Sequence, residues 1–239
     1  MTTLNIAGCK HTTKDLIKGL QRAGFNIDLV ITLEPKYAAK NKVAGYFDLR
    51  PFLHDEGIEY YLVDDYSLKS DADIQALSQR DLGVLLCMGW QRLIPEWLLK
   101  YLDVGAFGMH GSNKPLPHGR GRSPMNWSLI QGKEMFFTHF FQYKSGVDDG
   151  DVIGFQLFDI TPYDTAHTLH IKNLLSMIKL CETHLTRVLE NNFSTTPQKE
   201  VEPSFYPKRT ETDGIIFWED STQDVYNLVR AITHPFPGA

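Results

Sequence analysis

The chain has 239 residues, 42% of them hydrophobic and 22% charged, with a formal net charge of -5. This length suits one large globular domain or one domain with an appendage, and the acidic balance argues against an overall basic surface for nucleic acid. No amino-terminal signal pattern and no apolar run of about 20 residues is present, so neither secretion nor contact with a membrane is expected.

Alternating strand and helix patterns run through the N-terminal half. Apolar runs and helical spacing predict strands at 4–9, 27–33, 58–63 and 84–88 and helices at 12–23 and 70–79. The polar segment 34–50 indicates a loop or a short helix. This order predicts a parallel sheet with right-handed crossovers, in which the continuously apolar strand 84–88 is central.

The first strand-to-helix turn contains Gly8, Cys9 and Lys10. Backbone N–H groups and a lysine at such a turn can bind phosphate. An ordinary turn is the alternative, because no Gly-x-Gly-x-x-Gly pattern follows. The cysteines are few and odd in number, and we expect reduced, buried thiols in a cytoplasmic protein.

A hydrophobic loop follows the central strand, from Trp90 to Ile94, before Pro95 opens another helix. Trp90, Leu93 and Ile94 can serve as core residues. They can also form the apolar walls of a slot for a flat ring, and the two roles are compatible.

The segment 106–131, AFGMHGSNKPLPHGRGRSPMNWSLIQ, contains a strand that ends on His110, a long polar loop and a helix that begins at Pro124. A later strand, 136–143, leads into the acidic turn GVDDGDVIG, which contains Asp148. Sites in open α/β sheets form at the carboxyl ends of the strands. A histidine there, with a carboxylate able to reach it, indicates general acid/base chemistry.

The remaining elements complete the chain. A strand antiparallel to its predecessor is expected at 152–160, the longest helix at 165–191, an extended surface linker at 193–206, a short strand at 214–218 and a last helix at 222–232. Histidines on the long helix lack acidic partners at i+4, so no metal site is expected at His167, His170 or His184.

Several charged residues near the site allow two interpretations. Arg120 and Arg122 can bind a diphosphate or carboxylate, or can tie down the long loop. Asp149 and Asp151 are expected to belong to a solvated turn and not to a metal cluster. A loop histidine and a strand histidine, without catalytic roles, are expected at His118 and His139.

These motifs resemble the formyltransferase family, which includes the methionyl-tRNA, glycinamide ribonucleotide and sugar N-formyltransferases. The family carries Asn-x-His-x-Ser, then Leu-Pro and Arg-Gly-x-x-Pro, and later an Asp-x-Gly turn. The matching stretches here are His110-Gly-Ser112, Leu116-Pro117, Arg120-Gly-Arg-Ser-Pro124 and Asp148-Asp-Gly150. The resemblance implies an α/β fold with a Rossmann-like, mostly parallel sheet flanked by helices. It also implies a catalytic domain at 1–192 and a linker with a C-terminal extension at 193–239, which in longer members leads into a further region, so the chain is either shortened or a member without it.

The resemblance further implies a cytoplasmic enzyme that uses 10-formyltetrahydrofolate and no metal. The favoured acceptor is the amine of a nucleotide-linked amino sugar, as in lipopolysaccharide biosynthesis. His110 is expected to be the base or proton shuttle, with Asp148 orienting it. Expected folate contacts are Met88, Trp90, Gln91, Arg92, Leu93, Ile94 and Val147. Expected substrate contacts are Gly8, Cys9, Lys10, Arg120 and Arg122.

The chain departs from the family pattern at Gly108, where the family places an asparagine that supports the oxyanion. Two extra residues also lie between His110 and Pro117. Asn113 is the candidate replacement, with Ser112 and Asn126 as rivals.

Other acceptors also stay open, namely glycinamide ribonucleotide, methionyl-tRNA and hydroxyornithine. A different class is a non-catalytic module that binds folate or nucleotide, and Gly108 makes it credible. A homodimer contact through the exposed C-terminal segment is open too.

Overall fold

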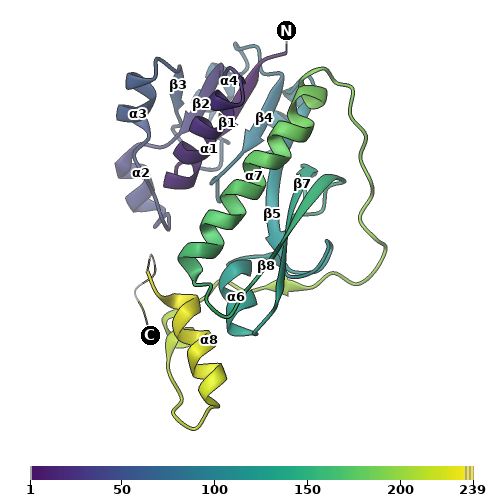
Figure 1. Ribbon diagram of the computed structural model, residues 1–239. Helices are drawn as coiled ribbons and strands as arrows, with labels where there is room; N and C mark the ends of the chain where they lie inside the picture. Colours follow the sequence, from purple (N-terminus) through teal and green to yellow (C-terminus); the bar gives the residue numbers. More distant parts are fainter. Residues whose placement is uncertain (1, 235, 237, 239) are drawn as a thin grey trace.

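A computed structural model describes residues 2–234, 236 and 238. Its main sheet has the strand order β3-β2-β1-β4-β5-β7-β8 (Figure 1). The strands are β1 (Leu4–Ala7), β2 (Leu29–Thr32), β3 (Tyr60–Leu62), β4 (Val84–Cys87), β5 (Gly105–Ser112), β7 (Met135–Gln142) and β8 (Val152–Asp159). Strands β1 to β5 pair in parallel, whereas β7 and β8 are antiparallel, so the predicted mostly parallel α/β sheet is confirmed.

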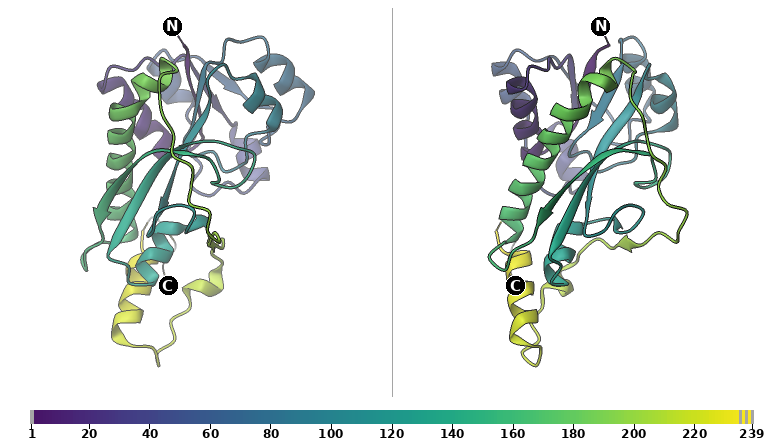
Figure 2. Two further views of the ribbon diagram at one scale, coloured as in Figure 1. Left: turned by 90° about the vertical axis from the view of Figure 1, so that its right-hand side faces the viewer. Right: turned by 45° about the vertical axis from the view of Figure 1, so that its right-hand side comes forward.

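Helices cover both faces of the sheet (Figure 2). The helices of the described residues are α1 (His11–Arg22), α2 (Pro35–Lys40), α3 (Arg50–Asp55), α4 (Asp71–Leu77), α5 (Glu96–Tyr101), α6 (Pro124–Ile130), α7 (Ala166–Leu189) and α8 (Thr222–Ile232). Alternate residues of the buried strands serve the two faces. In β4, Leu86 packs with α1 and α7, and Leu85 packs with α4 and α5. The helix α3 is not predicted by the sequence pattern.

The strand expected at 214–218 is wrong. Thr210 and Asp213 form a capping box, and residues Glu211–Gly214 make a 3₁₀ turn. Ile215 and Phe217 are about half exposed and face no neighbouring strand in the described part of the chain. The helical prediction beside it, 222–232, is confirmed as α8.

The long strand β5 continues beyond its parallel neighbour. The last residue of β4, Cys87, pairs with Gly108, and β5 continues to Ser112. Strand β7 runs back along β5, with Gln142 opposite Phe107. The acidic turn after β7 therefore returns to the level where β4 ends, which is how the carboxylate of Asp148 comes near His110.

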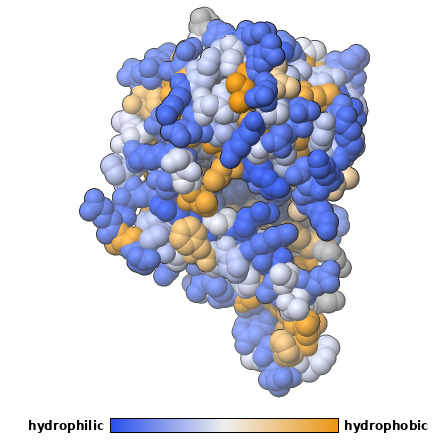
Figure 3. Space-filling view, turned by 180° about the vertical axis from the view of Figure 1, so that it is seen from behind, coloured by the Kyte–Doolittle hydropathy of each residue, from blue (hydrophilic) through white to orange (hydrophobic). Residues whose placement is uncertain are grey.

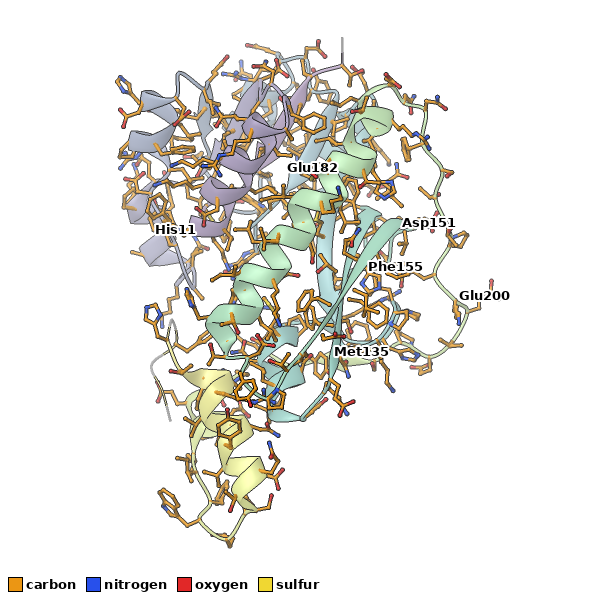
Figure 4. The ribbon with its side chains drawn as sticks, in the orientation of Figure 1. His11, Met135, Asp151, Phe155, Glu182 and Glu200 are labelled. Atoms are coloured by element: carbon orange, nitrogen blue, oxygen red, sulfur yellow. The ribbon has the colours of Figure 1, made fainter. Side chains whose placement is uncertain are left out.

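After α7 the chain returns along the outside of the sheet. Thr196 forms a bridge with Val152, and β9 (Phe205–Tyr206) pairs in parallel with β6 (Arg120–Gly121). Figure 4 shows Glu200 on the outer side of this segment. The segment is extended, as expected, but it is also hydrogen-bonded to the long loop before α6. It therefore takes part in the structure around His110.

Helix α8 packs against α6 and the start of α7, where Leu129, Leu169 and Ile232 share an apolar cluster. The end of the molecule near α8 protrudes and carries exposed hydrophobic side chains (Figure 3). Pro235, Pro237 and Ala239 of the expected extension lie outside the described residues. In the described part of the chain, no helix is both long and apolar enough to span a bilayer.

Candidate active site

His110 and Asp148 lie together, as the sequence predicts. The distance from Nδ1 of His110 to Oδ2 of Asp148 is 3.4 Å. The other ring nitrogen, Nε2, lies 2.7 Å from the carbonyl oxygen of Gly119. A carbonyl only accepts hydrogen bonds, so this contact assigns the Nε2 proton to the neutral ring. The lone pair is then on Nδ1, the nitrogen that faces the carboxylate of Asp148.

The carboxylate of Asp148 is fixed by the loop before α6. Its Oδ2 accepts a hydrogen bond of 3.1 Å from the backbone N–H of Gly121. Asp148 itself has a left-handed backbone, with φ of 49°, a conformation that aspartate tolerates better than most residues. The turn thus aims this carboxylate at the ring of His110.

Residues distant in the sequence hold the loop that carries Gly119 and Gly121. Ser204 accepts a hydrogen bond of 2.9 Å from the N–H of Gly119. His139 on β7 accepts a bond of 3.3 Å from the N–H of Leu116, and burial lowers the pKa of His139 to about 4. A neutral His139 is thus a structural support for the loop, in line with its expected non-catalytic role.

Gln198 connects three parts of the site. Its Nε2 donates to the carbonyl oxygens of Asp148 and Gly150, both at 2.8 Å. Its Oε1 accepts a bond of 2.6 Å from Nη2 of Arg120. This bond links Arg120 to the C-terminal segment, and Arg120 is not among the residues that line the pocket described below.

The loop after β4 is held by Tyr66. The hydroxyl of Tyr66 accepts a bond of 2.9 Å from the N–H of Gln91. Its ring meets that of Trp90 edge to face, with centroids 4.7 Å apart, and the guanidinium of Arg92 lies 4.8 Å from the same ring. Gly89, with φ of 81°, provides the left-handed turn that starts the loop.

An open pocket of about 550 Å³ lies between these loops. Its lining residues are Trp90, Gln91, Arg92, Leu93, Ile94, Met109, His110, Gly121, Arg122, Ser123, Phe141, Tyr143, Lys144, Gly146, Val147, Asp148 and Phe205. Among these lining residues are several that the sequence predicts for the site, namely His110, Asp148, Arg122, Val147 and the whole 90–94 loop. Figure 3 shows a hollowed face of the molecule on which hydrophobic and hydrophilic side chains lie side by side.

The predicted oxyanion donors do not line this pocket. Oδ1 of Asn113 accepts a bond of 2.9 Å from the hydroxyl of Tyr206. Ser112 donates to the carbonyl of His118 at 2.8 Å, and Asn126 donates to the carbonyl of Ala231 at 2.6 Å. Oδ1 of Asn113, the hydroxyl of Ser112 and Nδ2 of Asn126 thus hold the loop or α8.

The residues of the first strand-to-helix turn, Gly8, Cys9 and Lys10, do not line the pocket either. A Cβ atom on Gly8 would lie 2.2 Å from the carbonyl oxygen of Met88, so this glycine permits a close approach of two strands. Met88 is buried in the core. Cys9 is buried as well, and burial raises the pKa of its thiol. None of the three is among the lining residues.

Lys10 belongs to a group of basic side chains beside the pocket. Burial lowers the pKa of Lys10, and the charge of Arg122 acts in the same direction. Burial and then the charge of Lys10 lower the pKa of His170 to about 4. Arg122, which lines the pocket, is thus the accessible member of a group that favours anions.

Several lining residues are not predicted from the sequence. Tyr143 ends the predicted strand 136–143, and nothing local shows that its ring lies against Gly108. Phe205 comes from the C-terminal segment and has no local signal at all. Gln198 and Tyr66, which support the two loops, are likewise visible only in three dimensions.

The acidic turn also contains an ion pair, between Lys144 and Asp151 at 2.7 Å. Figure 4 shows Asp151 just before the start of β8, near the returning segment. Within residues 2–234, 236 and 238 there is no group of three or more His, Cys, Asp or Glu side chains arranged to hold a metal ion.

Comparison with known proteins identifies one matching family and several similar structures. The model of the formyl transferase family matches residues 4–175. The chain is similar to the structure of a sugar N-formyltransferase from Shewanella sp., with a TM-score of 0.74 and 15% identity over 100% of this chain and 92% of that one. It is also similar to an N-formyltransferase from Helicobacter canadensis in complex with folinic acid and dTDP-3-aminofucose, with a TM-score of 0.70 and 16% identity over 97% and 80% of the two chains.

A methionyl-tRNA formyltransferase from Clostridium thermocellum is similar too. Its TM-score is 0.62, with 16% identity over 99% of this chain and 86% of that one. At such identities the structural likeness shows the fold.

Proposed function

This chain belongs to the formyl transferase family, and on that premise we propose that it transfers a formyl group from 10-formyltetrahydrofolate to the amine of a nucleotide-linked amino sugar. One observation carries the proposal: the His110–Asp148 pair, with its 3.4 Å contact, lies in the wall of the same pocket as the 90–94 loop. A proton acceptor and a slot for a flat ring thus share one cavity.

The pocket fits a reduced folate in size and in chemistry. Its volume of about 550 Å³ is within the range of small-molecule sites. Trp90, Leu93 and Val147 supply apolar walls, and the indole Nε1 of Trp90 is buried without a hydrogen-bond partner among the described residues. Arg92 and Lys144 supply positive charge for a carboxylate tail. Bound folate supplies an activated formyl group, so the protein has to bind, orient and move a proton.

His110 is the proposed base. The acceptor amine bonds to the formyl carbon, the bond from that carbon to the folate nitrogen breaks, and the folate nitrogen takes a proton. One amine proton goes to Nδ1 of His110, and His110 then delivers a proton to the folate nitrogen as the bond to the formyl carbon breaks. Gly119 accepts from Nε2, and the carboxylate of Asp148, already held by Gly121, stabilises the imidazolium. A general base of this kind typically contributes about 100- to 10,000-fold.

The preference for a sugar nucleotide rests on charge. Arg122 lines the pocket, and Lys10 lies close enough for their charges to interact. A diphosphate would offset this concentration of positive charge. The net charge of the chain is -5, which disfavours a polyanion as large as tRNA. The similar Helicobacter protein was crystallised with a dTDP-linked amino sugar, which supports the same class of acceptor.

The test is an assay of the purified protein with 10-formyltetrahydrofolate and a panel of dTDP- and UDP-linked amino sugars. The expected result is a product that has gained one CO unit, together with stoichiometric release of tetrahydrofolate. Binding of folate without transfer to any amine would show a non-catalytic module instead. Transfer only to glycinamide ribonucleotide, methionyl-tRNA or hydroxyornithine would contradict the proposed sugar acceptor but would support the proposed formyl transfer.

A further inference from the structure

Formyl transfer builds negative charge on the formyl oxygen, and this chain has no side-chain donor at Gly108. Asn113, Ser112 and Asn126 do not line the pocket. A hydrogen-bond donor near His110 is nevertheless the expected source of stabilisation for that charge. The donor has to be found among the residues that line the pocket.

The space beside Gly108 is filled by the phenol of Tyr143. A Cβ atom built on Gly108 would lie 2.4 Å from the hydroxyl oxygen of Tyr143 and 2.3 Å from its Cε1. The absence of a side chain at this position therefore lets the phenol lie against the backbone of β5. Any larger residue at position 108 would displace it.

This position puts the hydroxyl on the same face of the sheet as His110. Residues two apart in a strand point to the same side, so the Cβ direction at Gly108 matches that at His110. The two positions are about 6.6 Å apart along the strand. Tyr143 and His110 both line the pocket. A formyl carbon between them can meet the base on one side and the hydroxyl on the other.

The ring of Tyr143 is held in place without using its hydroxyl. Its backbone N–H donates to the carbonyl of Ala106 at 2.8 Å, and its ring stacks on that of Phe141 with centroids 5.2 Å apart. Burial raises the pKa of Tyr143 well above its ordinary value, and the nearby Asp148 acts in the same direction. The hydroxyl therefore keeps its proton at working pH.

We propose that the hydroxyl of Tyr143 is the oxyanion donor of this enzyme and occupies the place that Gly108 leaves open. It donates a hydrogen bond to the formyl oxygen as the new carbon–nitrogen bond forms, and it releases no proton. The proposal rests on the proposed formyl transfer. It assigns a catalytic role to Tyr143 and makes the small residue at position 108 a requirement for that role.

The test is Tyr143→Phe, which removes the hydroxyl and keeps the ring that packs on Phe141. The expected result is a fall in kcat of about 100- to 1000-fold, the usual effect of losing one oxyanion donor. The KM values for folate and acceptor should change little, because the bond forms in the transition state. The pH dependence of kcat/KM should keep its shape, because the His110–Asp148 pair is unaltered.

A matched control is Tyr101→Phe. This hydroxyl also donates hydrogen bonds, to the carbonyls of Ser78 and Arg80, but Tyr101 is not among the pocket-lining residues. Its removal should leave kcat unchanged. Wild-type kcat in Tyr143→Phe overturns the inference, and so does a shifted pH profile, which would show an effect through His110. Absence of transfer by the wild-type protein is a separate outcome, which overturns the proposed function and this role together.

Discussion

The two loops that frame the pocket are built in different ways. The loop after β4, residues 88–94, is held by Tyr66, which comes from the same parallel half of the sheet. The loop before α6, residues 113–123, is held by residues that follow it, including Asp148, Ser204 and Tyr206. The first is fixed by neighbouring elements of a β-α-β fold. The second depends on contacts between segments far apart in the chain.

In the proposed mechanism, this difference separates folate binding from proton transfer. The 88–94 loop supplies the walls expected to enclose the pterin. The 113–123 loop supplies the carbonyl of Gly119 and the N–H of Gly121, which orient His110 and Asp148. We therefore expect changes near the first loop to act on folate affinity. Changes in the C-terminal segment that holds the second loop should act on the rate of transfer.

The largest effect is expected for His110→Gln. Glutamine keeps polar contacts near Gly119 but cannot take up the amine proton. The rate of transfer in a single turnover should fall by about 100- to 10,000-fold, the contribution of a general base. The dissociation constant for 5-formyltetrahydrofolate should change little, because the 88–94 loop is untouched. Wild-type turnover in this variant would show that His110 is not the base. The second loop would then have no assigned role in proton transfer.

A smaller effect on the rate is expected for Gln198→Ala. The change removes the bonds to the carbonyls of Asp148 and Gly150 and the bond from Arg120. Since the acidic turn loses support, we expect kcat to fall by about tenfold, in keeping with a misplaced catalytic group. Folate affinity, measured by isothermal titration, should stay near the wild-type value.

The opposite pattern is expected for Tyr66→Phe, the matched variant for Gln198→Ala. It removes the acceptor of the Gln91 N–H and keeps the ring contact with Trp90. A lost hydrogen bond of this kind weakens the loop by about 1 kcal/mol, so folate affinity should fall by about fivefold with little change in kcat. If both variants changed the same parameter, the separation of the two loops would be wrong.

The last effect concerns stability and not catalysis: it is a pH dependence through His139, which supports the second loop. Burial lowers the pKa of this side chain from 6.5 to about 4 in the folded protein. Between these values the unfolded chain binds more protons, so the free energy of unfolding should fall as the pH drops from 6.5 toward 4, by at most about 3 kcal/mol. Urea unfolding at pH 7.5 and pH 5 measures the change.

His139→Gln should reduce this pH dependence. His170 has its pKa lowered to about 4 as well, so part of the dependence should persist in the variant. A wild-type protein equally stable at both pH values would contradict a neutral, buried His139.

The sequence predicts the parallel half of the fold well because its signals are local. Continuous apolar runs indicate β1, β2 and β4, and Pro124 marks the start of α6. The pairing of His110 with Asp148 is also predicted, because both follow strand patterns. The short strand expected at 214–218 fails because its hydrophobic residues have no partner strand and stay exposed.

The parts of the site that the sequence does not predict are those made by distant contacts. The position of Tyr143 follows from an antiparallel register with β5 and from the empty space at Gly108. The role of Gln198 follows from the return of the chain after α7. No local pattern of residues encodes either one. Asn113 is predicted as the oxyanion donor from its position in the sequence alone. In the structure its Oδ1 accepts a hydrogen bond from Tyr206, a residue that is distant in the chain.

The central claim is that the two loops enclose one folate pocket next to His110 and Asp148. Amide hydrogen exchange with and without 5-formyltetrahydrofolate tests it most directly. We expect the ligand to slow exchange in residues 88–94 and in the segments around Gly121 and Asp148, with no change in α8. Slowed exchange confined to other surfaces, or no change in either loop, would contradict the claim.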